Sequence, residues 1–157
     1  MVRQQPVIAY VGLGSNLGDR KAHLFTALSL LTETDGVRVL QTSSFLENPA
    51  VGGPADSPPF LNGVVEIETT IGPHALLQRL MEIEQALGRQ RRVKWEPRVI
   101  DLDILLFGEQ IISSDDLVIP HPLMHERRFV LEPLAEIAPN ATHPVLQMTA
   151  KGLLESI

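Results

Sequence analysis

The sequence contains no cysteine among its 157 residues, so disulfide bonds and thiolate metal sites are excluded. It also lacks any run approaching the roughly 18 apolar residues that a membrane-spanning helix needs. The N-terminal residues lead directly into a strand-like pattern and are too short and too polar for a signal peptide. We therefore expect a cytoplasmic protein that has no membrane partner.

Aromatic residues are scarce, at 4% of the chain, and 13 basic residues stand against 19 acidic ones. The resulting net charge of −6 and the absence of an RNA-binding aromatic motif argue against a nucleic-acid partner. Apolar residues amount to 44%, which is enough for a hydrophobic core, and no repeat, linker or low-complexity tract interrupts the chain. The sequence predicts a single domain over residues 1–157, which we expect to be a monomer.

Two familiar ligand-binding motifs are incomplete. The segment 12–18, GLGSNLG, lacks the Gly-Lys-Ser/Thr of a P-loop and the third glycine of a dinucleotide-binding fingerprint. We interpret it as a turn followed by a helix cap. The five histidines show no zinc-ligand spacing, and the prolines on both sides of His121 keep it from sharing a helix face with His125.

Apolar periodicity and turn residues predict the order of the secondary-structure elements. In chain order they are a strand within 6–16, a helix over 20–33, strands over 36–47 and 60–70, a helix over 73–87, a strand over 99–107, a short strand pair within 109–122, and short helices over 127–139 and 149–157. The first six form a β-α-β-β-α-β series. This series predicts an α+β, ferredoxin-like split β-α-β antiparallel sheet with both main helices on one face and an extra C-terminal helical segment. We expect the other face to stay open for loops and a ligand.

Two aspartates interrupt the apolar strand in RVIDLDILLFG, residues 98–108. Because Asp101 and Asp103 are two residues apart, both side chains should project from the same face, roughly 6–7 Å from each other. Like charges at that separation repel, and they are costly to desolvate beside an apolar run. The pair therefore points to a binding partner of positive charge.

A basic cluster directly precedes the aspartates and consists of Arg89, Arg91, Arg92, Lys94 and Arg98. Mg²⁺ binds one or two carboxylates and completes its shell with water and substrate phosphates, and arginines bind the remaining phosphate oxygens. The carboxylate pair and the cluster together favour a magnesium–phosphate site. A surface ion-pair network among these residues remains the alternative. Trp95, which has few apolar neighbours in this loop, could serve as a lid over a flat ligand.

Four stretches together resemble the 6-hydroxymethyl-7,8-dihydropterin pyrophosphokinases of the folate pathway. They are YVGLGSNLGDR, FLNGVVEIET, ALGRQRRVKWEPRVIDLDILLFG and IPHPLMHERRFVLEPLAEIAP, and they cover nearly the whole chain in the family's order. The resemblance implies the ferredoxin-like fold. It also implies transfer of a diphosphoryl group from ATP to the hydroxymethyl oxygen of the pterin, with release of AMP.

The resemblance further implies roles for individual residues. Asp101 and Asp103 would hold two Mg²⁺ ions and act in catalysis together with Arg89 and Arg98. The ATP-binding residues would be Glu84, Arg89, Arg91, Arg92, Trp95, Arg98, Ile104, His121 and Arg127. The pterin-binding residues would be Asn48, Pro49, Val51, Phe60, Asn62, Trp95, Asp101 and Phe129. Two phenylalanines would stack on the flat ring, and the amide of Asn62 would pair with its polar edge.

Three positions depart from the usual family pattern. Glu96 stands where glycine or alanine is usual, Pro122 where an aromatic residue is common, and Met81 where glutamine is common. They leave the lid geometry and the nucleotide contacts open, but not the chemistry. A non-catalytic nucleotide- or RNA-binding module of the same fold is the alternative function, although the acidic charge and the few aromatic residues argue against it.

Overall fold

The computed structural model describes residues 5–48, 59–88 and 99–157. The main sheet consists of β1 (Val7–Ser15), β2 (Val37–Thr42), β3 (Leu46–Asn48), β4 (Phe60–Thr69) and β5 (Asp101–Phe107). The helices are α1 (Arg20–Thr32), α2 (Pro73–Ala86), α3 (Arg128–Ile137) and α4 (Ala150–Glu155), with a 3-10 turn, η1, over Met124–Glu126. Two small hairpins complete the fold: β6 (Ile112–Ser113) with β7 (Val118–Ile119), and β8 (Thr142–His143) with β9 (Met148–Thr149).

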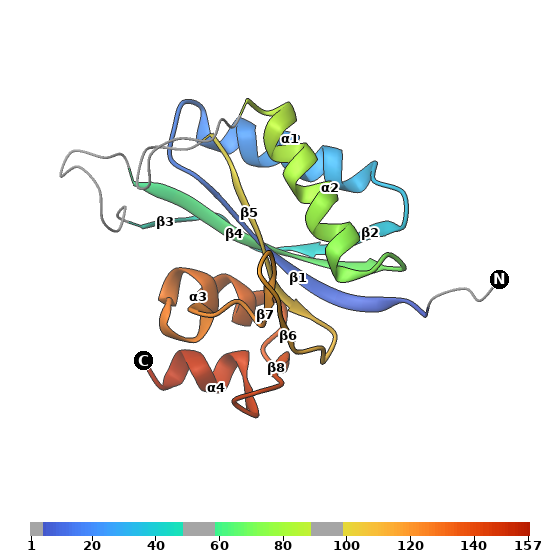
Figure 1. Ribbon diagram of the computed structural model, residues 1–157. Coiled ribbons are helices and arrows are strands. Elements are labelled where there is room, and N and C mark those ends of the chain that lie inside the picture. The colour runs from blue at the N-terminus through green and yellow to red at the C-terminus, as the bar shows by residue number, and fades with distance from the viewer. Residues whose placement is uncertain (1–4, 49–58, 89–98) are drawn as a thin grey trace.

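The strand order of the main sheet is β2-β4-β1-β5, with β3 paired to β4, and the pairs are antiparallel. The first and third long strands are therefore adjacent, which is the split arrangement that the element order predicts. Helices α1 and α2 lie on one face of this sheet, and α3 and α4 lie on the other (Figure 1). The prediction of an α+β, ferredoxin-like fold is confirmed.

Local sequence accounts for where the two main helices begin. Asp19 caps α1, because its carboxylate accepts a hydrogen bond from the backbone N–H of Ala22 at 3.1 Å. Pro73 occupies the first turn of α2, where a missing N–H costs nothing. Both helices bury an apolar stripe against the sheet, which includes Leu24 and Leu31 from α1.

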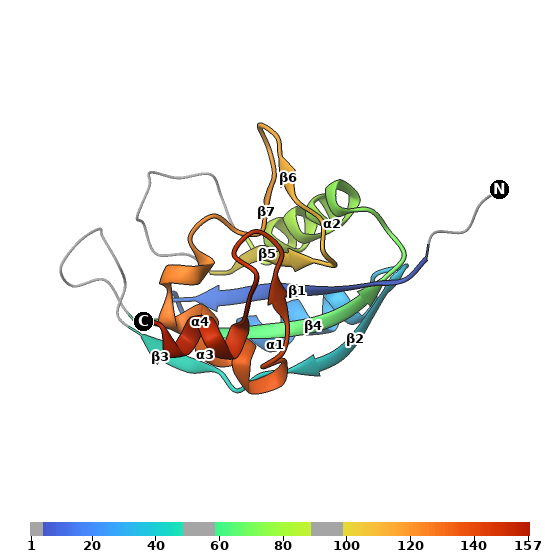
Figure 2. The same ribbon diagram turned by 90° about the horizontal axis from the view of Figure 1, so that it is seen from below.

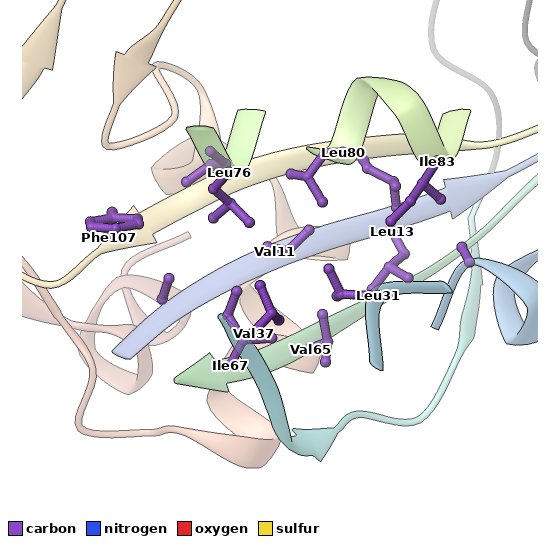
Figure 3. Close-up of a cluster of buried hydrophobic side chains, with 14 of the residues drawn as sticks. Val11, Leu13, Leu31, Val37, Val65, Ile67, Leu76, Leu80, Ile83 and Phe107 are labelled. Atoms are coloured by element: carbon purple, nitrogen blue, oxygen red, sulfur yellow. The ribbon is translucent and has the colours of Figure 1, made fainter. Parts of the chain in front are cut away.

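The larger hydrophobic core lies between the sheet and the helices α1 and α2 (Figure 3). Val11 and Leu13 of β1 project into it, together with Val65 of β4 and Leu80 of α2 (Figure 3). At roughly 25 cal/mol for each Å² of apolar surface removed from water, this layer is the main source of folding free energy. It holds the central strand β1 rigidly from one side.

The opposite face is only partly open, so the expectation of a free face is wrong. A second apolar cluster, which includes Val64, Leu105, Leu106 and Met124, is covered by α3 and α4. Figure 2 shows these two helices in front of the sheet. The physical reason is that two leucines and a valine on this face must be removed from water. The uncovered part therefore lies toward the C-terminal end of β1, beyond this second cluster.

A β-bulge in β5 explains how two consecutive leucines face the same side. Val11 is paired with Ile104 and Tyr10 with Leu106, so Leu105 is an extra residue in the strand. Because of this extra residue, Leu106 joins Leu105 in the second cluster while Phe107 returns to the first.

Two elements differ from the sequence prediction. The strand predicted over 36–47 is divided into β2 and β3, because the hydroxyl of Ser43 accepts a hydrogen bond from the N–H of Val64 at 2.8 Å in place of a regular ladder bond. The hairpin of β8 and β9 was not predicted, since each strand has only two residues. In the described part of the chain, no helix has the length and apolar character needed to cross a membrane.

The small β8–β9 hairpin contains a buried histidine. His143 is 6% exposed, and its Nδ1 accepts hydrogen bonds from the N–H groups of Val145 at 3.3 Å and Leu146 at 3.1 Å. Burial, and to a lesser extent the neighbouring His125, lower the pKa of His143 below its usual value. A proton on Nδ1 would face the two N–H groups, so the fold favours the neutral ring.

This histidine predicts a loss of stability in mild acid. Because the pKa is lower in the folded than in the unfolded state, the unfolded chain takes up the proton first as the pH falls. The free energy of unfolding should be highest above about pH 7 and should fall as the pH drops through about 6.5 and below. In His143→Asn, the amide oxygen can accept the same two N–H groups but cannot be protonated, so this decline should be smaller.

Urea unfolding at several pH values between about 7.5 and 5.5 measures this effect. His74→Asn is the matched control, because His74 is 53% exposed and lies on α2. The same decline in the wild type and in His143→Asn would contradict the prediction.

Candidate functional site

The floor of the second face near the C-terminal end of β1 consists of two glycines, of which Gly12 is half-buried and Gly14 is buried beside the side chains of Asn62 and Phe60. The residues of β1 that face this side near its C-terminal end are Gly12 and Gly14. Gly14 lies between Asp101 of β5 and Asn62 of β4, and Gly12 lies between Asp103 and Val64. With strands about 4.8 Å apart, the aspartate strand and the asparagine strand are separated by about 10 Å across this floor. A flat ligand could lie on it and contact both sides.

One wall of this floor is formed by Asp101 and Asp103, which alternate with the buried Leu102. Both carboxylates project from the same sheet face, as the strand spacing predicts, and Asp103 is exposed. Among the described residues, no group of three or more histidine, aspartate or glutamate side chains could hold a metal ion. A pair of carboxylates does not form a complete protein cage, but it fits Mg²⁺ that shares its shell with water and phosphates.

The free edge of β5 is stabilised by a buried glutamate. Glu84 of α2 is 7% exposed, and its Oε2 accepts a hydrogen bond from the backbone N–H of Leu102 at 2.8 Å. Leu102 lies between the two aspartates, and β5 is at the edge of the sheet. Glu84 thus fixes the strand segment that carries the carboxylates, and its side chain lies on the face opposite to them.

His121 lies close enough to Asp103 and Arg127 for their charges to act on its ring. Its backbone N–H donates to the carbonyl of Leu105 at 3.0 Å, and its Nδ1 accepts from the N–H of Leu123 at 3.3 Å. Burial lowers the pKa of His121, Arg127 lowers it further, and Asp103 raises it. Because Nδ1 accepts the hydrogen bond from Leu123, the proton of the neutral ring is on Nε2, and Nε2 is a hydrogen-bond donor.

Arg127 and Phe129 lie at the start of α3, which packs over β4 and β3. The guanidinium carbon of Arg127 is 5.8 Å from the centroid of the Phe129 ring, within the range of a cation–π contact. Arg127 and His121 together supply positive charge and a hydrogen-bond donor on the same side as the carboxylates. Phe129 is half-buried.

The other wall of the floor is neutral and consists of Phe60, Asn62 and Asn48. The side-chain N–H of Asn48 donates a hydrogen bond to Oδ1 of Asn62. The amide nitrogen of Asn62 is 3.5 Å from the carbonyl oxygen of Leu13. These two contacts fix which end of the Asn62 amide points toward each neighbour. Phe60 is paired with Asn48 across β3 and β4.

The remaining residues expected from the sequence are less informative. Ile104 is 4% exposed, and its side chain lies in the first core, on the face opposite to the aspartates. A contact between Ile104 and a nucleotide therefore stays a prediction. Seven of the expected site residues lie outside the described ranges: Pro49, Val51, Arg89, Arg91, Arg92, Trp95 and Arg98.

The two glycines of the floor were not predicted from the sequence, because GLGSNLG indicates a turn followed by a helix cap. The available signal was their position in the strand pattern YVGLGS, where they alternate with the apolar residues Val11 and Leu13. Glycine in the interior of a strand weakens it and often marks a place where a ligand or another group approaches closely. The alternation of glycine with buried residues thus indicates a bare strip on one sheet face.

The fold and this site define a ferredoxin-like α+β domain with a ligand floor between a charged and a neutral wall. The family profile described as 7,8-dihydro-6-hydroxymethylpterin-pyrophosphokinase (HPPK) matches residues 10–139. The chain belongs to this family, and it is accordingly an enzyme that transfers diphosphate from ATP to a hydroxymethyl pterin in folate biosynthesis.

Two curated relatives carry the name 2-amino-4-hydroxy-6-hydroxymethyldihydropteridine pyrophosphokinase. The protein from Bacillus subtilis is 50% identical over 130 residues, which cover 83% of this chain and 77% of the relative. The protein from Methylorubrum extorquens is 48% identical over 132 residues, which cover 84% and 83%.

The comparison with solved structures supports the fold. A crystal structure described as HPPK-DHPS in complex with substrates superposes with a TM-score of 0.74 at 17% sequence identity. The match covers 97% of this chain but only 43% of that longer chain.

The floor predicts that one of its two glycines tolerates no side chain. A Cβ at Gly14 would lie 2.7 Å from the amide nitrogen of Asn62, whereas a Cβ at Gly12 would meet only the side chain of Leu105, at 3.4 Å. If the pterin contacts the Asn62 amide, as the resemblance in sequence implies, Gly14→Ala should displace that amide and weaken pterin binding about tenfold or more, because a polar contact is lost. Gly12→Ala, the matched control, should change it much less.

Calorimetric titration of the pterin into both variants measures the difference, and thermal unfolding verifies that each is folded. If Gly14→Ala bound the pterin as tightly as Gly12→Ala, the floor would not constrain the ligand.

Proposed function

We propose that the floor of Gly12 and Gly14 is the site of diphosphate transfer. The observation that carries the proposal is the pairing across β1: Asp101, Gly14 and Asn62 lie side by side on one sheet face. In this arrangement the pterin lies against the neutral wall, and its hydroxymethyl group points toward the carboxylates. The phosphates of ATP then lie on the charged side, near Asp103.

Recognition of the pterin requires stacking and a polar edge contact. Phe60 and Phe129 supply aromatic surface from β4 and α3, and stacking on one such ring contributes roughly 1–3 kcal/mol. Asn62 supplies an amide whose orientation is fixed by Asn48. A flat heterocycle rich in donors and acceptors matches this combination. Pro49, Val51 and Trp95 complete the pterin pocket in this proposal.

The carboxylates of Asp101 and Asp103 hold Mg²⁺ in this proposal, with two ions expected. Bound Mg²⁺ would neutralise charge on the phosphates and the attacking hydroxyl oxygen. Asp101 would hold the ion and would also lie beside the pterin, which would bring the hydroxymethyl group close to the phosphates. Glu84 holds the backbone between the two aspartates and so preserves their spacing.

The protein's own positive groups bind and orient the ATP. His121 donates from Nε2 to a phosphate oxygen, and Arg127 contributes charge beside it. Arg89 and Arg98 stabilise the charge that develops during transfer, and further nucleotide contacts come from Arg91, Arg92 and Trp95. Nucleotide contacts of Glu84 and Ile104 stay predictions from the resemblance, because both side chains are buried on the opposite face of the sheet. Phosphoryl transfer depends mainly on such positioning and charge neutralisation, since little covalent help is needed.

Several expectations remain part of this proposal. The protein acts as a single domain over residues 1–157, as a monomer and in the cytoplasm, with no nucleic-acid partner. The alternative of a non-catalytic nucleotide- or RNA-binding module is wrong, because the chain belongs to an enzyme family.

An assay of AMP release from ATP, Mg²⁺ and 6-hydroxymethyl-7,8-dihydropterin tests the proposed roles. Asp101→Asn and Asp103→Asn should each lower kcat by roughly 100-fold or more, the order expected when one preorganised electrostatic group is lost. Because asparagine has a similar volume, thermal unfolding should change little. Mg²⁺ titration in the presence of a non-hydrolysable ATP analogue should show weaker ion binding in both variants.

Asp115→Asn serves as the matched control, since Asp115 is exposed and lies between β6 and β7. It should retain wild-type turnover. Near-normal turnover by Asp101→Asn or Asp103→Asn in limiting Mg²⁺ would contradict the assignment of the metal site.

A further inference from the structure

Arg20 makes two contacts that no function assigned so far explains. It is the first residue of α1, and its side chain is 27% exposed. One guanidinium nitrogen donates to the carbonyl oxygen of Pro59 at 3.0 Å, and another lies 2.5 Å from the carboxylate of Glu47. The two partners are 39 and 27 residues away in sequence. One side chain thus joins three separate parts of the chain.

The two partners of Arg20 belong to the two strands that form the neutral wall. Glu47 is the middle residue of β3 and is paired with Leu61 of β4. Pro59 directly precedes Phe60, the first residue of β4. Because side chains alternate along a strand, Glu47 points toward α1 while its neighbour Asn48 points to the ligand face. Arg20 therefore binds β3 and the start of β4 on the α1 face of the sheet, opposite to the face that carries the side chains of Asn48 and Phe60.

Strand β3 has few other attachments. It has three residues and pairs only with β4, so it lies at an edge of the sheet. Its approach is tied to α3, because the N–H of Ser44 donates to the carboxylate of Glu136 at 2.9 Å. Arg20 provides the corresponding tie at the other end, next to Asn48. Without it, the described contacts at the end of β3 nearest the site would be the ladder with β4 and the hydrogen bond from Asn48 to Asn62.

The energetic balance favours a local effect over a global one. Glu47 is 58% exposed, and an ion pair of this kind contributes only about 0–1 kcal/mol to stability. The position of Asn48, however, determines the orientation of the Asn62 amide through their hydrogen bond. A displacement of about 1 Å in a positioning group can cost far more in function than in stability.

We infer that Arg20 is a positioning residue for pterin binding. It bridges Glu47 and Pro59, and so sets the positions of Asn48 and Phe60 on the neutral wall. This inference rests on the proposed function, since it requires that the pterin binds there. The geometry also explains why arginine suits this position: its planar fork presents several N–H groups that can reach two acceptors at once, whereas the single ammonium group of lysine is compact.

The start of α1 gives this arginine a fixed origin. The carboxylate of Asp19 caps the helix, and the N–H of His23 donates to the carbonyl oxygen of Asp19 at 3.0 Å. Gly18, with φ of 69°, turns the chain into this cap. The second half of the motif GLGSNLGDR, residues 17–20, thus forms the helix cap and supplies Arg20. The first half, residues 12–15, forms the floor.

The test compares Arg20→Gln, Arg20→Lys and Glu47→Gln with a control ion pair. Arg79→Gln is the matched control, since Arg79 contacts Glu82 at the same distance of 2.5 Å on the exposed surface of α2. Calorimetry measures the Kd of 6-hydroxymethyl-7,8-dihydropterin and, separately, of a non-hydrolysable ATP analogue with Mg²⁺. Thermal unfolding is recorded for every variant.

Arg20→Gln should weaken pterin binding roughly threefold to tenfold and leave the affinity for the ATP analogue unchanged, since only the neutral wall moves. Arg20→Lys should recover part of the loss, and Glu47→Gln should show a smaller loss because the contact with Pro59 remains. Arg79→Gln should change neither affinity, and its melting temperature should differ from that of Arg20→Gln by no more than a few degrees.

Three results would overturn the inference: wild-type pterin affinity in Arg20→Gln, equal losses for pterin and ATP analogue, or the same pterin loss in Arg79→Gln. Failure of the proposed function is distinguishable from these results. It would appear as near-normal turnover in Asp101→Asn and Asp103→Asn, a result that is independent of the pterin affinity of the Arg20 variants.

Discussion

The constraint on which the site depends is the packing of one strand between two layers. β1 is central in the sheet, with Val11 and Leu13 buried under α1 and α2 on one side. On its other side the strand presents a tyrosine and then two glycines. The first core holds β1, and the glycines on its opposite face leave space that the side chains of Asn62 and Phe60 enter beside Gly14. A ligand at that face would thus lie against side chains that pack on a strand whose position is already determined by the core.

The two walls beside this strip separate two kinds of chemistry. Asp101 and Asp103, with His121 and Arg127 nearby, make one side charged, while the other side offers an aromatic ring and two amides. A protein with a net charge of −6 can still bind an anionic substrate if positive groups are concentrated at the site. Here the net charge of the molecule does not predict the charge of its ligand, whereas the positive groups near the aspartates do.

Much of the architecture follows from local sequence, and the rest follows from contacts without local signals. Alternation in FLNGVVEIET and RVIDLDILLFG predicted strands and the shared face of the two aspartates correctly. The covering of the second face was not predicted, because the short helix α3 carries no mark of which layer it will join. The hydrogen bond from Leu102 to Glu84 joins residues 18 positions apart, and spacing alone does not reveal such a pair.

The resemblance in sequence supplied the roles of the site residues, and the physical pattern supplied only some of them. From residue type alone, Phe60 and Phe129 are predicted to be core residues, since large aromatic side chains are usually buried. In the structure both are half-buried, Phe60 at the start of β4 and Phe129 at the start of α3, the helix that packs on β4. Their type favours burial, whereas the partial exposure of Phe60 depends on its place beside Gly14, where the neighbouring strand carries no side chain.

The bulge at Leu105 has a consequence for how β5 finds its place. With strict alternation, Asp101 and Asp103 would share a face with Phe107, which belongs to the larger core. A regularly paired β5 of the same seven residues would either expel Phe107 from that core or carry both carboxylates into it. Removing a carboxylate from water costs several kcal/mol, so such a pairing is strongly disfavoured. The acidic pair thus discriminates among alignments of the chain before any substrate is present, and the residues assigned to the reaction also help select the native strand register.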